Sequence, residues 1–347
     1  MSTAESQAIR MLQHDQDLPR ELVEAVLLRM FSGVCSNADM SVFLVGLQRK
    51  GESVEELVGA ATAMRRSMVR VATDYPVVLD TCGTGGDGSQ TFNISTAAAI
   101  VIAAAGVPVA KHGNRKVTSS TGSADVLSEF GINLEAPPSV VERCLNELKL
   151  CFCFAQRFHP AMKHVAETRR SISGPTIFNR LGPICNPASA NRQVLGVGSA
   201  DLQHKLASAL SELGTQRSLV VRGQDGVDEV SLESPTEVLE VCSPAGQIGA
   251  GELQSYTWEP SHFGIERHSR LALFADSPRA SAECIRQALS GQQCAYRDAV
   301  LINAAAGLWL AGQSPDLRQC ATQAAAAIDT GQAADLIIQL RDLTTSS

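Results

Sequence analysis

The sequence has no excess of basic residues. Its 29 lysines and arginines are outnumbered by 36 aspartates and glutamates, which gives a net charge of −7 at pH 7. Proteins that hold nucleic acid through its phosphates usually present a strongly basic surface. The charge balance therefore argues against general nucleic-acid binding, although it leaves room for one local basic pocket for a small anion.

Long apolar runs are also missing. The segment from Ala97 to Val109 is only about a dozen residues long, includes a glycine and a proline, and is too short to span a bilayer. The segment 1–20 is polar and lacks the apolar core that a signal peptide needs. We therefore expect no membrane partner and no secretory signal, and hence a cytoplasmic location.

Cysteine pairing motifs are absent as well. The ten cysteines include no Cys-x-x-Cys pair, a spacing typical of zinc sites and redox-active thiols. Cys151 and Cys153 fall in a short apolar run that reads as a buried strand. We predict reduced core thiols, as is usual in the cytoplasm, and neither a zinc site nor a disulfide framework.

The first part of the chain predicts helices and no strand. The length of 347 residues allows one large domain or two of ordinary size. Over residues 5–75, Ser53 and Glu56 have the spacing of a capping box, and Asn37 is a candidate N-cap. Apolar residues recur at helical spacing in one run: Leu22, Val23, Val26, Leu27 and Met30.

After Tyr75 the pattern changes to strands that alternate with helices or loops. The predicted strands are PVVLD, VPVAK, CFCFA, VLGVGS and SLVVRG, and the last 70 residues read as helical. This alternation predicts an α/β fold with a largely parallel sheet flanked by helices. We expect a helical domain over 1–75, with a returning helical segment at about 165–190, and an α/β domain over 76–164 and 191–347.

One loop is unusually rich in glycine. The stretch DTCGTGGDGSQTFNIST has four glycines from Gly83 to Gly88 and ends at the start of a predicted helix. Glycine costs conformational entropy and adds no side-chain packing, so such a cluster is typical of a backbone that closely approaches an anion. Asn93, Ser95 and Thr96 add polar donors at the helix N-terminus, at the strand end where open α/β sheets bind ligands.

A second polar loop, KHGNRKVTSSTGS, follows the next predicted strand. It carries Lys111, Arg115 and Lys116 together with several serines and threonines. Two anion-seeking loops at neighbouring strand ends predict a ligand with two phosphate groups. Neither loop has the Walker pattern or a GxGxxG pattern with an acidic residue about twenty positions later. The structural alternative for each loop is a flexible turn before an N-capped helix.

Two further stretches carry charge. In DGVDEV, Asp225, Asp228 and Glu229 follow the apolar run SLVV, and carboxylates at a strand end near phosphates suit Mg²⁺. The alternative is an exposed acidic turn without a metal.

The stretch RFHPAMKHVAETRRS crowds His159, Lys163, His164, Arg169 and Arg170 together. Arginines near a phosphate pocket can bind the carboxylate of a second substrate. The alternatives are structural histidines and a surface arginine that pairs with a neighbouring glutamate or with solvent.

Together these motifs resemble the anthranilate phosphoribosyltransferase family. GTGGDGSQTFNIST, KHGNRKVTSSTGSADVL, RFHPAMKHV, TIFNRLGPICNPA and DGVDEV occur in the family's order and spacing, and the resemblance covers essentially the whole chain. It implies a small helical domain, a large α/β domain with a central mixed, mostly parallel sheet, and a homodimer formed through the helical domains. It also implies Mg²⁺-dependent transfer of phosphoribosyl from phosphoribosyl pyrophosphate (PRPP) to the amine of anthranilate, in tryptophan biosynthesis.

The resemblance also implies roles for individual residues. Magnesium is expected at Ser95, Asp228 and Glu229. No essential acid or base is expected, because an aromatic amine is already neutral at pH 7; His112, Asn114 and Arg169 position the substrate. Anthranilate is expected at Gly83, His112, Asn114, His159 and Arg169. PRPP is expected at Gly83, Gly86, Asp87, Thr91, Asn93, Ile94, Ser95, Thr96, Lys111, His112, Gly113, Asn114, Arg115, Lys116, Val117, Thr118, Ser119 and Ser123.

Three positions depart from the family pattern. Pro175 stands where an arginine is usual, Arg222 where a histidine is usual, and Arg180 where an apolar residue is common. Pro175 and Arg222 leave open a transferase or phosphorylase with another acceptor. A second alternative is a non-catalytic relative that binds nucleic acid, which should be basic and should lack the GTGGD loop and the acidic pair.

Overall fold

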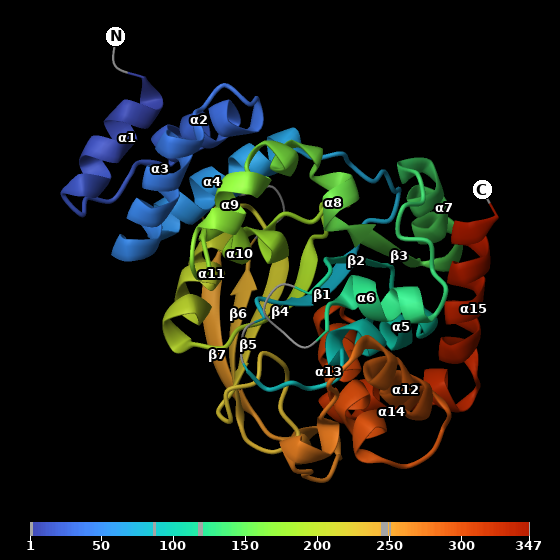
Figure 1. The fold of residues 1–347 in the computed structure, drawn as a ribbon. Helices are drawn as coiled ribbons and strands as arrows, with labels where there is room; N and C mark the ends of the chain where they lie inside the picture. Colours follow the sequence, from blue (N-terminus) through green and yellow to red (C-terminus); the bar gives the residue numbers. More distant parts are fainter. Residues whose placement is uncertain (1–2, 86–87, 117–120, 244–248, 250, 347) are drawn as a thin grey trace.

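The computed structural model describes residues 3–85, 88–116, 121–243, 249 and 251–346 (Figure 1). The first four helices pack together at the N-terminal end of the molecule: α1 (Ala4–Gln13), α2 (Arg20–Phe31), α3 (Asn37–Lys50) and α4 (Val54–Ser67). The predicted capping box of Ser53 and Glu56 is confirmed at the start of α4. The predicted N-cap of α3 was wrong: Ser36 caps the helix by accepting from Asp39 N at 3.1 Å, and Asn37 is the first helical residue.

A seven-stranded sheet forms the centre of the molecule, in the order β3-β2-β1-β4-β5-β6-β7. The strands are β1 (Leu79–Gly83), β2 (Val109–Gly113), β3 (Leu150–Phe154), β4 (Arg192–Gly196), β5 (Arg217–Gly223), β6 (Thr236–Cys242) and β7 (Glu252–Trp258). Strands β1 to β5 pair in parallel, and β6 and β7 are antiparallel. The fold class expected from the sequence and the family resemblance, an α/β fold with a mixed and mostly parallel sheet, is confirmed.

The motif pattern had not indicated strands β6 and β7. Two glutamates interrupt the apolar run of β6, which hides it as a strand in the sequence. Arginines of β5 neutralise both: Arg222 Nη2 lies 2.6 Å from Glu237 Oε2, and Arg217 Nε lies 2.5 Å from Glu240 Oε1. The cross-strand pairing that makes these charges acceptable is visible only once the strands are side by side.

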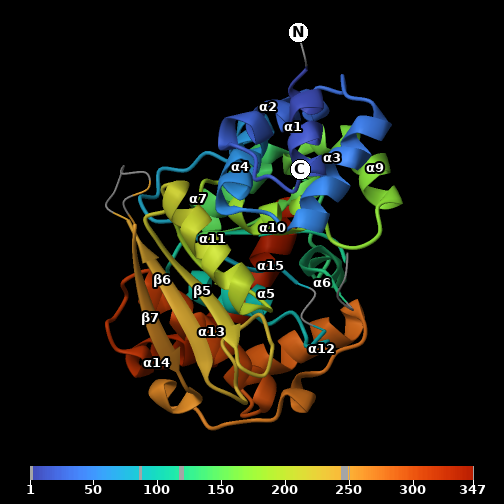
Figure 2. The ribbon, with the colours of Figure 1, turned by 90° about the vertical axis from the view of Figure 1, so that its left-hand side faces the viewer.

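Both faces of the sheet are buried at its central strands, whereas most of the edge strand β7 is exposed. Adjacent residues of β4 and of β5 belong to different hydrophobic clusters, Val194 and Leu219 on one face and Leu195 and Val220 on the other. This is the two-residue alternation of a strand covered on both sides. On one face the sheet packs against α5 (Ile94–Ala104) and α13 (Ala295–Leu310), and on the other against α11 (Ala200–Glu212), which also contacts α4 (Figure 2).

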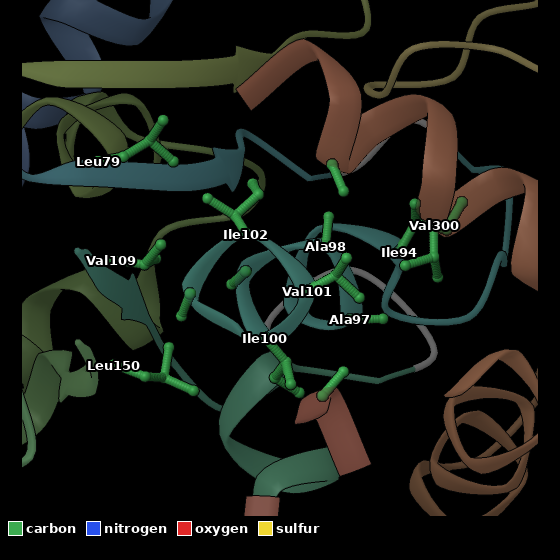
Figure 3. Close-up of a cluster of buried hydrophobic side chains, with 14 of the residues drawn as sticks. Leu79, Ile94, Ala97, Ala98, Ile100, Val101, Ile102, Val109, Leu150 and Val300 are labelled. Atoms are coloured by element: carbon green, nitrogen blue, oxygen red, sulfur yellow. The ribbon is translucent and has the colours of Figure 1, made fainter. Parts of the chain in front are cut away.

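Helix α5 is almost entirely enclosed. Its side chains lie between the strands β1 to β3 and helix α13, so that Ile102 faces Leu79 and Ile100 lies near Leu150 (Figure 3). The other helices of this part are α6 (Ser123–Glu129), α7 (Pro138–Leu148), α12 (Pro278–Leu289), α14 (Leu317–Asp329) and α15 (Gln332–Thr345), with the 3₁₀ turns η3 (Pro260–Phe263) and η4 (Arg270–Leu273). The alanine-rich composition of α5 is therefore that of a buried helix.

The chain returns to the first four helices after β3. The returning elements are α8 (Ala155–Phe158), η1 (Pro160–His164), α9 (Ala166–Ser171), α10 (Ile177–Leu181) and η2 (Gly182–Ile184). Val165, Ile177, Phe178 and Leu181 share a hydrophobic cluster with the residues of α1 to α4. This segment therefore connects the sheet to the N-terminal helices and lies beside the strand ends that carry the site.

All ten cysteines are free thiols, as predicted, but not all lie in the core: Cys242 is exposed, and Cys35, Cys82 and Cys294 are only partly buried. Within the described part of the chain, no helix has both the length and the apolar character that a membrane crossing requires.

Candidate active site

A cleft of about 240 Å³ opens at the carboxyl ends of β1 and β2. The glycine-rich loop after β1, the basic loop after β2 and the acidic turn after β5 all line it. Segments that are far apart in sequence meet here because the carboxyl ends of parallel strands share one edge of the sheet. The two loops and the acidic turn therefore meet in one cleft, as their positions in the sequence had led us to expect.

Glycine is required where the acidic turn crosses the strand ends. A Cβ added to Gly83 would lie 2.3 Å from Asp228 Oδ2, and one added to Gly196 would lie 1.6 Å from the Asp228 carbonyl oxygen. The Asp228 carboxylate also accepts a hydrogen bond from Gly85 N at 2.9 Å. Glycine at these strand ends therefore lets the acidic turn lie directly against the glycine-rich loop.

Ser95, Asp228 and Glu229 present hard oxygen atoms to the same cleft. Ser95 N donates to Glu229 Oε1 at 3.1 Å, so the acidic turn is tied to the first turn of α5. In the described ranges, no group of three or more His, Cys, Asp or Glu could hold a metal by itself. Two carboxylates and a hydroxyl fit Mg²⁺, which commonly completes its shell with phosphate oxygens and water.

Lys111 forms the floor of the cleft. Its ammonium group donates to the Thr81 carbonyl and, at 3.3 Å, to Ser95 Oγ. Burial lowers the pKa of Lys111, and the nearby Asp80 carboxylate opposes that shift. The amine is therefore a buried hydrogen-bond donor at the strand ends, next to the start of α5.

Asp80 lies buried beside Lys111 and His112, and the sequence analysis did not select it. Its two carboxylate oxygens accept from His112 N at 3.1 Å and from Asn186 Nδ2 at 2.8 Å. Complete burial raises the pKa of Asp80 to about 6, with Lys111 and Asn186 acting against the rise. No local motif marks Asn186 as its partner, because the two are brought together only by the return of the chain after α10.

His112 and His159 form a buried pair with their Nε2 atoms 3.2 Å apart. Burial lowers the pKa of His112 to about 3, with His159 contributing, and lowers that of His159 to about 4. His112 Nδ1 donates to the Gly182 carbonyl at 2.8 Å, because a carbonyl can only accept. The neutral His112 ring then accepts from His159 through Nε2, so neither ring offers a free base at this contact.

Arg169 lies on α9, beside α10 and outside the lining of the cleft. Its Nη2 donates to Asn179 Oδ1 at 3.2 Å, and its guanidinium carbon lies 6.0 Å from the centre of the Phe178 ring. Burial lowers the pKa of Arg169. Among the described residues no carboxylate lies within ion-pair distance of it, so the expected alternative of a pair with Glu167 is not formed.

Comparisons with known proteins identify the family of this chain. The model described as "Glycosyl transferase family, helical bundle domain" matches residues 6–68, and "Glycosyl transferase family, a/b domain" matches residues 75–334. An anthranilate phosphoribosyltransferase from Rhodopirellula baltica is 48% identical over 97% of this chain and 96% of its own length. The chain belongs to the anthranilate phosphoribosyltransferase family.

Solved structures of the family have the same fold. The anthranilate phosphoribosyltransferase of Thermus thermophilus is 37% identical, with a TM-score of 0.88 and coverage of 97% of this chain and 99% of that one. The enzyme from Saccharomyces cerevisiae in complex with PRPP and Mg is 28% identical, with a TM-score of 0.89 and coverage of 99% and 98%.

Many of the residues expected from the family resemblance line the cleft. They are Gly83, Thr91, Asn93, Ser95, Lys111, His112, Gly113, Asn114, Arg115, Ser123, Asp228 and Glu229. Ile94, Thr96, Lys116, His159 and Arg169 do not line it; Ile94 and Thr96 are buried in α5, and Lys116 is exposed. Gly86, Asp87, Val117, Thr118 and Ser119 lie outside the described residues.

The sequence analysis also missed residues that support the cleft. Asn93 Oδ1 accepts from Thr121 Oγ1 at 2.6 Å and from Ser281 Oγ at 2.9 Å. Thr121 falls inside the basic-loop motif and could have been selected there. Ser281 lies on α12, almost two hundred residues from Asn93, and carries no local signal.

Two of the three departures from the anthranilate phosphoribosyltransferase pattern have intramolecular partners. Arg180 Nε lies 2.8 Å from Glu52 Oε2, and Arg222 pairs with Glu237 on the neighbouring strand. Pro175 is exposed, directly before the N-cap residue of α10. Both arginines are therefore engaged within the fold.

Proposed function

We propose that this chain transfers the phosphoribosyl group of PRPP to the amine of anthranilate, giving N-(5-phosphoribosyl)anthranilate and pyrophosphate in tryptophan biosynthesis. The observation that carries the proposal is the meeting of three segments in one cleft: the glycine-rich loop, the basic loop with Lys111, and the acidic turn of Asp228 and Glu229. The family relatives named above, and the yeast enzyme that binds PRPP and Mg, support it.

The reaction mainly requires charge stabilisation and alignment. Loss of pyrophosphate leaves an oxocarbenium-like centre at the anomeric carbon, and negative charge develops on the leaving group. Lys111, which lies at the strand ends beside the first turn of α5, can stabilise that charge. Ser95, Asp228 and Glu229 would hold Mg²⁺, which supplies further neutralisation of the pyrophosphate when bound.

The second substrate needs orientation more than activation. The anthranilate amine is neutral at pH 7, so attack on the anomeric carbon needs no strong base. Arg169 can hold the carboxylate through two parallel hydrogen bonds and so direct the amine. The neutral, mutually hydrogen-bonded rings of His112 and His159 suit a positioning role next to this site.

The test is consumption of anthranilate, followed by its fluorescence, with PRPP and a divalent cation added separately and together. We expect loss of fluorescence only when both are present. Turnover of a nucleoside with orthophosphate, without any use of anthranilate, would instead establish the phosphorylase alternative.

The chain is further proposed to be a cytoplasmic homodimer that associates through its helical domain, residues 1–75 with the returning segment at about 165–190, while 76–164 and 191–347 form the α/β domain. Val34, Val42 and Val45, on α3 and just after α2, are 61%, 49% and 42% exposed, which is unusual for large apolar residues and supports an interface there. Val42→Arg should therefore convert a dimer to a monomer in sedimentation experiments. A wild-type monomer at micromolar concentration would refute the association.

A further inference from the structure

Asn179 has two tasks that meet at one oxygen atom. Its Oδ1 accepts from Thr176 N at 3.0 Å, which completes the capping box at the start of α10. The same oxygen accepts from Arg169 Nη2 at 3.2 Å. An amide oxygen has two lone pairs, which suit the Thr176 N and Arg169 donors; the Thr176 hydroxyl lies farther from it, at 3.5 Å. The side chain therefore links the geometry of α10 to the direction of the Arg169 guanidinium.

Helix α10 gives this oxygen a fixed position. Ile177, Phe178 and Leu181 are buried in the cluster formed with the N-terminal helices. The next residue, Arg180, pairs with Glu52, whose side chain is only 4% exposed. Apolar packing and an ion pair both hold the short helix, so the position of Asn179 Oδ1 is fixed. The Phe178 ring of the same helix also contacts the Arg169 guanidinium.

The neutrality of Asn179 is as informative as its position. Other arginines near the N-terminal helices have carboxylate partners, including Arg20 with Glu55 and Arg29 with Glu5. Arg169 is half-buried, and among the described residues its side chain contacts an amide oxygen, that of Asn179, and an aromatic ring, that of Phe178. An amide fixes a guanidinium without cancelling its charge, which leaves that charge for an incoming carboxylate.

We propose that Asn179 is a positioning residue for the acceptor substrate: it orients Arg169 toward the anthranilate carboxylate, and its lack of charge keeps the guanidinium available. The proposal rests on the function proposed above. It makes a specific distinction, because an aspartate at this position would preserve the helix cap while giving Arg169 an internal counterion. A purely structural role for Asn179 has no reason to penalise that change.

The test compares Asn179→Asp and Asn179→Ala with the wild type in steady-state kinetics. We expect Asn179→Asp to raise the KM for anthranilate by about 10-fold or more, since a charged hydrogen-bonding partner must be displaced. The kcat at saturating anthranilate and the Kd for PRPP, measured by calorimetry, should each change by less than about 3-fold. Asn179→Ala removes the oxygen without adding charge and should raise KM by a smaller factor.

Thr176→Val is the matched control. It removes the hydroxyl that caps α10 and that lies 3.5 Å from Asn179 Oδ1, but it keeps the two closer donors to that oxygen, Thr176 N and Arg169. It should therefore lower the Tm without moving the KM for anthranilate. An unchanged KM in Asn179→Asp, or a larger KM effect in Asn179→Ala than in Asn179→Asp, would overturn the positioning role and assign Asn179 to helix capping. A wild-type protein that does not consume anthranilate would overturn the proposed function itself, before any variant is compared.

Discussion

Gly196→Ala tests whether the position of the acidic turn controls the use of Mg²⁺ and PRPP. Gly196 lies at the end of β4 and contributes no side chain to the cleft. A Cβ at this position would lie 1.6 Å from the Asp228 carbonyl oxygen and 2.4 Å from its carbonyl carbon. Ordinary contacts begin near about 3.5 Å, so the turn and the strand must separate by well over 1 Å.

That displacement determines the expected magnitude. Both Asp228 and Glu229 would move away from Ser95, and a shift of about 1 Å at a reacting centre can reduce a rate by about 100-fold. We expect kcat/KM for PRPP to fall by roughly that factor, with partial recovery as Mg²⁺ is raised. Overpacking should also lower the free energy of unfolding by about 1–3 kcal/mol.

Gly307→Ala is the control for the stability effect. A Cβ there would lie 2.4 Å from Ile102 Cδ1, in the core between α13 and α5 and away from the acidic turn. The control should lose stability, measured by urea unfolding, and keep its Mg²⁺ dependence. If Gly196→Ala has normal kinetics at low Mg²⁺, or if Gly307→Ala reproduces its Mg²⁺ dependence, the reasoning about the turn is refuted.

Three further predictions address the charges of the site. Asp228→Asn combined with Glu229→Gln should abolish most turnover at low Mg²⁺ and leave folding intact, because the amides keep the shape but bind the cation weakly; a flat Mg²⁺ titration would contradict this. Arg169→Ala should lower kcat/KM for anthranilate by about 10- to 150-fold while PRPP affinity stays within about 3-fold, and the neighbouring Arg170→Ala should do little. The free energy of unfolding should fall as pH drops below about 6.5, because burial lowers the pKa of His112 to about 3 and that of His159 to about 4, so the unfolded chain binds protons that the folded protein excludes. Asp80 acts in the opposite direction, because its pKa is raised to about 6 and the folded protein therefore takes up a proton there below that pH. Urea unfolding of a variant with both histidines replaced by glutamine should show a free energy of unfolding that falls less than in the wild type, or rises, between pH 6.5 and 5.

The sequence by itself determined the local features of this protein. Helical periodicity, the Ser53–Glu56 capping box and short apolar runs depend on neighbours only a few residues apart, so they can be read directly. The glycine-rich loop, the basic loop and the acidic turn could be placed at one edge of a parallel sheet because each follows a predicted strand. Family resemblance then supplied candidate roles that the pattern alone could not.

Only the tertiary structure decided the contacts between distant segments. The motif pattern had not indicated strands β6 and β7; the two glutamates that interrupt β6 are neutralised across the sheet by Arg217 and Arg222, which only the pairing of β5 with β6 reveals. The buried partners of the site, Asp80 with Asn186 and Asn93 with Ser281, are joined by hydrogen bonds across more than a hundred residues. Such pairs leave no periodic signal, because hydrogen-bond geometry depends on how the chain returns to the sheet. The partner of Arg169 is hidden in the sequence for the same reason. Only the packing of α10 beside α9 shows that an amide, and not a carboxylate, contacts its guanidinium.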